Sequence, residues 1–335
     1  MFGSTRVQGE QEARKRGTPQ LTRLVASRVS WGVLTLLAVS VLIFWATEVL
    51  PGNAAYAVLG HNGSPEQVHN LMVQLHLNRS IPSQYGSWIG GIVQGDLGHS
   101  LSDGSSVSSL IAPRLVNSAA LALTAGLIGT VLAVLLGVWA AARKDSKLDD
   151  AISTMALAIT ALPEFVVAIV LVILFSTVVF HFLPGVSVLA PGTKPWSAPT
   201  LMVLPVTALV VIVSPYILRM TRAAMIEALE SDYCEMAQLK GVSRRRLLFM
   251  HALPNALPPI IQVVALTFLY LAGGIVIVEV AFAYPGIGQG LVNAVAARDI
   301  PVIQAIVLGL AAFYVLVNIA ADVAVLLVTP RRRGA

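Results

Sequence analysis

The sequence predicts an all-α membrane protein with six transmembrane helices. Of its 335 residues, 56% are apolar and 12% are charged, which is roughly half the charged fraction of an ordinary soluble domain. The apolar residues also form uninterrupted blocks, and about 20 helical residues are enough to cross a hydrocarbon core of about 30 Å. These blocks lie at about 31–50, 116–142, 151–183, 200–220, 257–283 and 302–328.

Two of the blocks need comment. The third is overlong for one span, and Pro163 is the expected position of a kink. The first follows basic residues and precedes a small-residue pattern at 55–57, which together resemble a secretory signal with its cleavage site. Its apolar run, 32–50, is longer than the core of about 7–15 residues in such signals, so a retained helix is favoured.

The basic residues predict the orientation. Eighteen of the 22 lysines and arginines fall before the first block, after the second and fourth blocks, and in the tail, while four fall in the other loops. The positive-inside rule makes the first set cytoplasmic, so both termini are expected in the cytoplasm. The net charge of +5 is explained by this topology and gives no support for a nucleic-acid partner.

The expected organisation is one membrane domain with short polar ends. A long external loop follows the first block, and a long cytoplasmic loop follows the fourth. Gly126-x-x-Gly129 and Gly273-Gly274 are expected to permit close helix packing. The predicted segments are 1–28 (polar, disordered cytoplasmic extension), 29–330 (membrane domain, with external loop 51–115 and cytoplasmic coupling loop 221–256) and 331–335 (basic cytoplasmic tail).

The cytoplasmic loop is expected to contain two short helices joined at a glycine. Asp232 and Glu235 have the spacing of a capping box, so a helix should begin there. Gly241 follows Lys240 at the expected end of this helix, where glycine can take the left-handed conformation. The residues alone leave two interpretations equally open: a solvated basic loop near anionic lipid, or a docking element that transmits force from a soluble partner.

The second helix of the loop is expected to start after Ser243, which can act as its N-cap. It would run through three consecutive arginines to Leu253. Pro254, Pro258 and Pro259 are expected to break the chain before the fifth span begins.

The same loop resembles the signature segment of bacterial ABC importer permeases, in the branch that transports dipeptides, oligopeptides and nickel. The matching positions are Glu235, Ala237, Gly241, Leu253 and Pro254, with Met236 where the most common form has a second alanine. Further matches run in order along most of the chain, although 51–54 reads Pro-Gly-Asn-Ala where the family usually has Pro-Gly-Asp-Pro. They include Gly95, Asp96, Gly98, Ser100, Arg219, Arg222, Met225, Asp232, Tyr233, His251, Asn255, Glu279, Phe282, Pro285, Gly286, Gly288, Arg298, Asp299, Pro301, Asn318, Asp322, Pro330 and Arg331.

This resemblance implies a type I ABC importer permease that translocates di- or oligopeptides across the bacterial plasma membrane. It implies four protein partners, which are a second homologous permease, two cytoplasmic ATPases and an extracytoplasmic binding protein, and it implies contact with membrane lipid. The segment around Asp232, Glu235, Ala237, Gly241, Leu253 and Pro254 would couple the chain to an ATPase. Because the binding protein largely selects cargo in this family, peptides, glutathione, haem and nickel complexes stay open.

The chain itself is expected to be a transport subunit without catalytic or cofactor-binding residues. It has no Gly-x-x-x-x-Gly-Lys-Ser/Thr phosphate-binding segment, so ATP and magnesium are expected in the partner ATPases. An ion-coupled secondary transporter would call for a carboxylate relay or an inverted repeat, and neither is evident. A membrane-embedded hydrolase would need a nucleophile with its base or a metal pair, which is also not evident.

Three carboxylates fall inside predicted spans: Glu164, Glu279 and Asp322. A charge at the bilayer centre costs at least about 2.5–3.5 kcal/mol, so each should face protein or a water-filled cavity. All three are candidates for the translocation path, where Glu164 could meet the amino group of a peptide. For Glu279 and Asp322, pairing with a neighbouring helix is favoured.

Cysteine and histidine give no metal site. The single cysteine, Cys234, is expected to be a small residue on a helix. Four histidines lie in the external loop, but their spacing does not match a known set of ligands, so surface positions are expected. These are His61, His69, His76 and His99.

Overall fold

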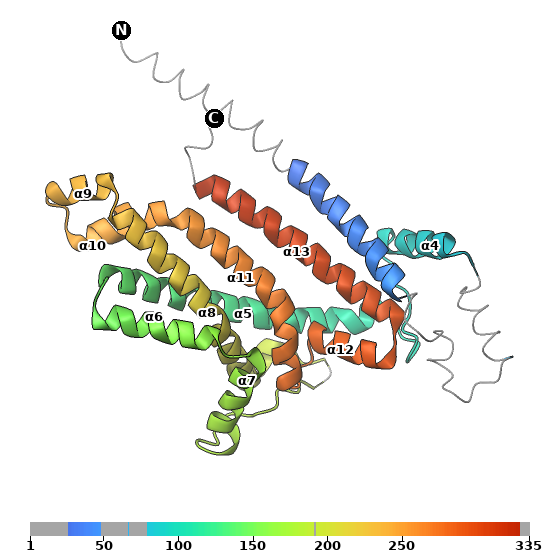
Figure 1. The fold of residues 1–335 in the computed structure, drawn as a ribbon. Coiled ribbons are helices and arrows are strands. Elements are labelled where there is room, and N and C mark those ends of the chain that lie inside the picture. The colour runs from blue at the N-terminus through green and yellow to red at the C-terminus, as the bar shows by residue number, and fades with distance from the viewer. Residues whose placement is uncertain (1–25, 48–65, 67–78, 191, 329–335) are drawn as a thin grey trace, which may run out of the picture.

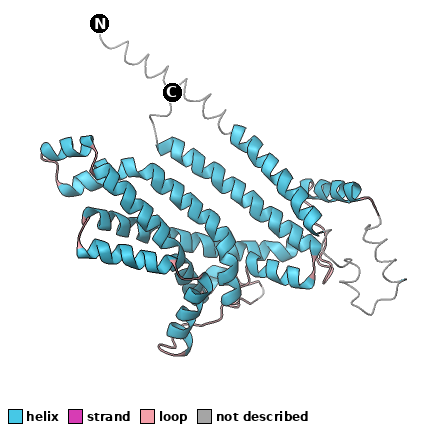
Figure 2. Ribbon diagram, viewed as in Figure 1, coloured by secondary structure: helices cyan, strands magenta, loops and turns pink. Residues whose placement is uncertain are grey.

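The chain is built of helices (Figure 2). The computed structural model describes residues 26–47, 66, 79–190 and 192–328, and in this part every element is helical, which confirms the all-α prediction. The α-helices are Ala26–Thr47 at the N-terminal side, α4 (Ile81–Val93), α5 (Val107–Ala142), α6 (Lys147–Thr160), α7 (Glu164–Val172), α8 (Pro199–Leu229), α9 (Asp232–Leu239), α10 (Arg244–Arg246), α11 (Leu253–Ala281), α12 (Ile287–Ala297) and α13 (Ile300–Val328). Three short turns complete them: the π-helical η1 (Ile173–Thr177) and η3 (Leu247–Ala252), and the 3-10 turn η2 (Pro195–Ser197).

The long helices agree with the predicted spans. Among the described residues, five helices are long and apolar enough to cross a membrane, and a sixth span results if the bent pair α6–α7 is counted as one. Each overlaps one predicted block. Helix α5 begins at Val107, earlier than the predicted 116, and its polar residues Asn117 and Ser118 donate to the Pro285 carbonyl and to Glu279.

The predicted kink at Pro163 is a sharp break. The axes of α6 and α7 differ by 103°. Pro163 occupies the N-cap position of α7 with an extended backbone (φ −60°, ψ 143°). Proline cannot supply the N–H group that would continue α6, and it disfavours the helical conformation of the residue before it. The prediction of a kink at Pro163 is therefore confirmed.

The predicted break before the fifth span is wrong. Helical structure is continuous from Arg244 to Leu271, through α10, η3 and α11. Pro254 lies in the first turn of α11, where the missing N–H costs little, while Pro258 and Pro259 lie further inside. The wider π-helical turn of η3 directly precedes Pro254, and such turns adjust the backbone where regular hydrogen bonding fails.

Helix α8 is the centre of the bundle and packs against α5, α6, α7 and α11 (Figure 1). In its most apolar 18-residue window 56% of the residues are buried, against 17% for the helix Ala26–Thr47. Helix α8 therefore connects four other helices of the bundle.

Glycines set the distance between α5 and its neighbours. A Cβ on Gly126 would lie 2.5 Å from the Phe268 ring, and one on Gly129 would lie 3.2 Å from Val213. The prediction of close packing is confirmed at these two positions. Gly273 is exposed and has no heavy atom of the described chain within 4 Å of an added Cβ, so close packing at this position stays a prediction.

Candidate functional site: the segment from α9 to α10

The segment between α8 and α11 starts with a redirection of the chain at Ser231. Ser231 is the N-cap residue of α9, with φ −77° and ψ 147°, and its hydroxyl donates to the carbonyl of Ala228 at 2.6 Å. The predicted start of α9 is confirmed, but the predicted capping box is wrong, because Asp232 already lies in the helix. Asp232 and Glu235 instead place two carboxylates in the first turn, where they interact favourably with the helix dipole.

Gly241 ends α9 in the predicted left-handed conformation, with φ +79°. The amide of Gly241 donates to the carbonyl of Gln238 at 2.9 Å, and that of Val242 donates to the carbonyl of Ala237 at 3.2 Å. This pair of bonds is a Schellman motif, in which glycine satisfies the last carbonyls of a helix and reverses the chain. Ser243 then takes the N-cap position of α10, as expected.

One side of α9 is fixed to the membrane helices. Cys234 has no exposed surface and packs with Met225 of α8, Val138 of α5 and Leu247 of η3, and Ala237 packs against the same cluster. Leu253 at the start of α11 also contacts this cluster, whereas Pro254 is exposed. Cys234 is thus a buried packing residue.

A polar contact adds to this anchorage. The Tyr233 hydroxyl donates to the carbonyl of His251 at 2.9 Å and accepts from Asn255 Nδ2 at 3.0 Å. Asn255 Nδ2 also donates to the His251 carbonyl at 2.8 Å. Burial raises the pKa of Tyr233 above its ordinary value, so its hydroxyl keeps its proton near neutral pH. The three groups tie α9 to the π-helical turn that precedes α11.

The opposite side of α9 and η3 presents apolar side chains. Met236 is 54% exposed and Leu239 is 76% exposed on α9, and Met250 is 66% exposed on η3. Met236 and Leu239 are three residues apart, so they lie on one helical face. Exposed apolar anchors at this spacing are typical of a helix that binds in a groove of another protein.

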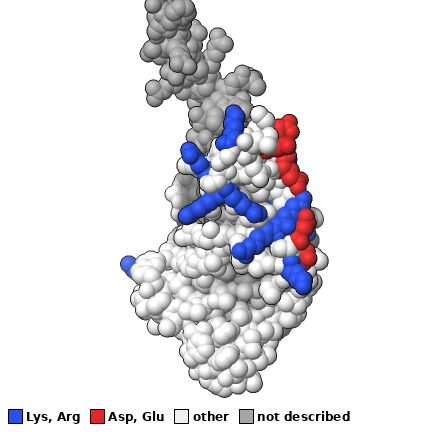
Figure 3. All heavy atoms as spheres, turned by 90° about the vertical axis from the view of Figure 1, so that its left-hand side faces the viewer, with Lys and Arg blue, Asp and Glu red and all other residues white. Residues whose placement is uncertain are grey.

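Basic residues surround these apolar anchors. Figure 3 shows the end of the molecule that carries α9 and α10, where lysine and arginine side chains cross the face and acidic side chains follow one edge. The exposed basic residues at this end include Arg143, Lys144, Lys147, Lys240, Arg244, Arg245 and Arg246.

Glu279, near the end of α11, is buried and fully bonded. Its Oε1 accepts from the Ser118 hydroxyl at 2.5 Å, and its Oε2 accepts from the backbone amides of Gly288 and Gln289 at 2.7 and 3.1 Å. The carboxylate thus caps the N-terminus of α12. A Cβ on Gly286 would lie 2.0 Å from Glu279 Oε1, and one on Gly288 would lie 2.6 Å from the Val276 backbone. The Pro-Gly-x-Gly pattern therefore has a steric cause, which the sequence did not reveal.

Glu164, at the start of α7, is half-buried. Its Oε1 accepts a hydrogen bond from the Tyr270 hydroxyl of α11, and its Oε2 has no partner among the described residues. The Tyr270 ring lies 6.3 Å from the Tyr216 ring of α8. These tyrosines are 43% and 50% exposed, so a polar face of the bundle is open beside Glu164.

Asp322, on α13, pairs with the helix Ala26–Thr47. Its Oδ2 lies 2.9 Å from Arg28 Nε, and both side chains are partly exposed. The same two helices approach closely one turn away, where a Cβ on Gly32 would lie 2.5 Å from Val315. The three intramembrane carboxylates therefore lie in three separate places and form no relay.

Two further sequence matches, far apart along the chain, meet at the end opposite α9. Asp299, 3% exposed, accepts from the Ser100 hydroxyl, from the Ser102 hydroxyl at 3.0 Å and from the Leu101 amide at 3.1 Å. This contact fixes the loop between α4 and α5 against the start of α13, and no local sequence signal could have predicted it.

Of the four histidines in the predicted external loop, only His99 lies among the described residues, where it is exposed. No group of three or more His, Cys, Asp and Glu side chains in the described part of the chain could hold a metal ion. His61, His69 and His76 lie outside the described residues.

Comparison with known proteins identifies the family. Residues 133–334 match the family described as "binding-protein-dependent transport system inner membrane component", and residues 21–122 match its N-terminal companion. A putative peptide transport system permease of Brucella abortus is 36% identical over 93% of this chain and 99% of its own length. A probable peptide ABC transporter permease of Sinorhizobium fredii is 33% identical over 93% and 98%.

Two other proteins are also similar. A glutathione transport system permease of Escherichia coli is 32% identical over 92% of this chain and 98% of its own length. A chain of the methionine ABC transporter MetNI, solved in inward-facing conformations, has a TM-score of 0.55 at 19% identity and covers 66% of this chain and 96% of that chain, a likeness that shows the fold. The family match spans more than half of the chain and the relatives align along nearly all of it, so the chain belongs to the binding-protein-dependent transport system inner membrane components, the permease subunits of ABC importers.

Proposed function

We propose that this chain forms one half of the pathway through which peptides enter a bacterial cell. Two of the relatives above carry the name of a peptide permease and align over 93% of the chain. ATP, with magnesium, is bound and hydrolysed by separate ATPase subunits, so the chain transports without being an enzyme. The family description supports a location in the bacterial plasma membrane, and the distribution of basic residues supports a cytoplasmic position for both termini.

The observation that carries this proposal is the exposed face of α9. Leu239 and Met236 are open to solvent at the basic end of the bundle, while Cys234 anchors the opposite side of the same helix. A groove on one ATPase subunit would receive the two apolar anchors and move α9 when nucleotide closes the ATPase pair. Asp232, Glu235, Ala237, Gly241, Leu253 and Pro254 shape this coupling element.

A second homologous permease would lie against the open face beside Glu164. This face carries Tyr216 and Tyr270, which are poorly suited to lipid tails, and Gly273, which leaves room for close approach. Of the three intramembrane carboxylates, we assign Glu164 to the translocation path. The Glu279 carboxylate already accepts hydrogen bonds from the N-terminus of α12, and Asp322 already forms an ion pair with Arg28.

Affinity purification from mild detergent, followed by reconstitution, tests the proposal. We expect to recover a second permease and two ATPases, and to measure ATP-driven uptake of a labelled peptide mixture once the binding protein is added. Competition with unlabelled glutathione, haem and a nickel complex distinguishes the other cargoes of the family. Uptake that needs an ion gradient but no ATP would contradict the proposal.

A further inference from the structure

Three polar contacts join the turn between α5 and α6, and the start of α6, to the C-terminal part of α8 and to α10. Arg244 of α10 donates to the carbonyl of Ala142, the last residue of α5. Lys144 pairs with Glu230 at the end of α8. Asp149 of α6 pairs with Arg222 of α8. The three partners, Arg222, Glu230 and Arg244, lie on both sides of α9 in the sequence. The turn and the start of α6 are therefore attached before and after α9.

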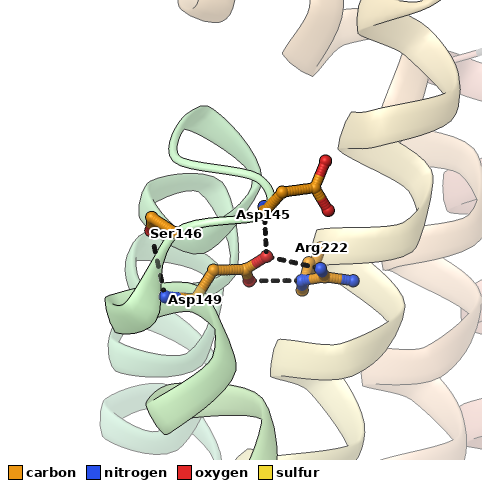
Figure 4. A network of polar contacts seen from close by, with 4 residues as sticks. All are labelled: Asp145, Ser146, Asp149 and Arg222. Carbon is orange, nitrogen blue, oxygen red and sulfur yellow. Dashed lines mark hydrogen bonds and ion pairs between the residues drawn. The ribbon is translucent and has the colours of Figure 1, made fainter.

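The Asp149–Arg222 contact is the most constrained of the three (Figure 4). Arg222 Nε donates to Asp149 Oδ1 at 2.5 Å, and Arg222 Nη2 donates to Oδ2 at 2.6 Å. The side chain of Asp149 is 1% exposed, and that of Arg222 is 28% exposed. Two parallel bonds to a buried carboxylate fix the orientation of both partners as well as their distance.

Asp149 also organises its own turn. Its Oδ2 accepts from the backbone amide of Asp145 at 3.1 Å, and its backbone amide donates to the Ser146 hydroxyl at 3.2 Å. One carboxylate therefore joins the turn, the start of α6 and the side of α8.

Apolar packing does not duplicate this link at the α9 end. The buried cluster around Cys234 contains residues of α5, α8, α9, η3 and α11, but among the described residues none from α6. The apolar contact between α6 and α8 lies deeper in the bundle, where Ala156 packs with Ile217 and Leu218. Next to α9, the contact between α6 and α8 is therefore polar.

We propose that Asp149 and Arg222 are positioning residues that make α6 move with α9. The inference rests on the proposed function, in which α9 follows an ATPase. Arg222 lies two turns before the end of α8, which leads directly into α9, and α6 leads through its 103° break to α7 and Glu164. When α9 and α8 move, the ion pair would therefore move α6 as well, and with it α7 and Glu164.

The test compares two substitutions one residue apart in the reconstituted complex of both permeases, both ATPases and binding protein. Asp149→Asn keeps the size of the side chain and removes its charge, whereas Asp150→Asn makes the same change at an exposed position. We expect about tenfold less labelled peptide imported per ATP hydrolysed for Asp149→Asn, within the usual range of coupling between sites, and no change for Asp150→Asn. Equal amounts of assembled complex separate this loss from a folding defect.

A covalent link gives the second arm. Asp149→Cys and Arg222→Cys, in a Cys234→Ala background, are joined by a short bis-methanethiosulfonate reagent. We expect import per ATP to fall in the unlinked variant and to return after linking. Linked complexes that hydrolyse ATP without import would overturn the inference, because the pair would then have to open. Asp149→Asn with the same ratio as Asp150→Asn would overturn it too, whereas a wild-type complex without ATP-driven uptake would instead contradict the proposed function.

Discussion

The buried carboxylates at the two ends of the bundle have different kinds of partner. At the α12 end, Glu279 and Asp299 are almost fully buried, and their carboxylates accept hydrogen bonds from serine hydroxyls and backbone amides. At the α9 end, the buried carboxylate of Asp149 is neutralised by an arginine, and α9 exposes apolar side chains. The buried carboxylates of the α12 end thus find their hydrogen-bond donors within this chain, whereas the exposed face of α9 is a surface that an ATPase subunit would cover.

This comparison predicts that substitutions at the α12 end reduce stability and those at the α9 end reduce coupling. Glu279→Ala leaves the amides of Gly288 and Gln289 and the Ser118 hydroxyl without their acceptor. At about 1–3 kcal/mol for each of these unsatisfied groups, we expect the unfolding free energy to fall by at least about 3 kcal/mol. Thermal unfolding in detergent measures it, with Glu164→Ala as the control that loses one hydrogen bond. Equal stability of the two variants would contradict this account of the α12 end.

Leu239→Asp is expected to have the next largest effect, on binding of the ATPases. Leu239 is 76% exposed, so the substitution should leave the thermal stability of the permease unchanged. Loss of a central apolar anchor typically costs about 2 kcal/mol, or about 30-fold in affinity. Titration of the purified permease pair with the ATPases measures this loss, and Leu239→Met serves as the control that keeps an apolar anchor. Unchanged affinity for Leu239→Asp would place the docking surface elsewhere.

Gly241→Asp separates charge from backbone strain. Any side chain at φ +79° strains the turn by about 1 kcal/mol, although no heavy atom lies within 4 Å of the added Cβ. Gly241→Ala introduces this strain without a charge. We expect both variants to insert and assemble, but only Gly241→Asp to hydrolyse ATP without import, as measured in proteoliposomes. Normal ATP-driven import by Gly241→Asp would remove the reason for assigning this turn to coupling.

Lys144→Gln is expected to have the smallest effect. The Lys144 and Glu230 side chains are 44% and 60% exposed, so solvent screens this ion pair and it contributes little to stability. We expect the unfolding temperature and the import per ATP to stay near the wild-type values. A loss as large as that of Asp149→Asn would mean that exposure does not distinguish the two contacts.

Local sequence signals predicted the features that depend on local chemistry. Apolar runs located the spans, Gly241 marked the end of α9, and Pro163 marked the break between α6 and α7. Each of these follows from the conformational limits of the residue itself. The prolines near the start of α11 gave the wrong prediction of a break in the helix. Whether a π-helical turn can accommodate such prolines depends on packing around the helix, which the local sequence does not show.

The contacts that join distant segments could not be predicted in the same way. Ser100 and Asp299 belong to separate sequence matches, and only the fold brings them together. The same holds for Asp149 and Arg222, whose pairing depends on how α6 lies beside α8. Gly286 and Gly288 could be matched to a family pattern. Why glycine is required there became clear only from the structure, in which Glu279 and Val276 leave no room for a side chain.

The most direct test of the docking surface is site-specific photocrosslinking in the assembled complex. A benzophenone side chain is placed at Leu239, and for comparison at Trp45, which is 61% exposed on the helix Ala26–Thr47. We expect position 239 to form a covalent adduct with an ATPase subunit, identified by mass spectrometry, and position 45 to form none. Absence of an ATPase adduct from position 239, or an equal yield from position 45, would contradict the assignment of α9 as the coupling surface.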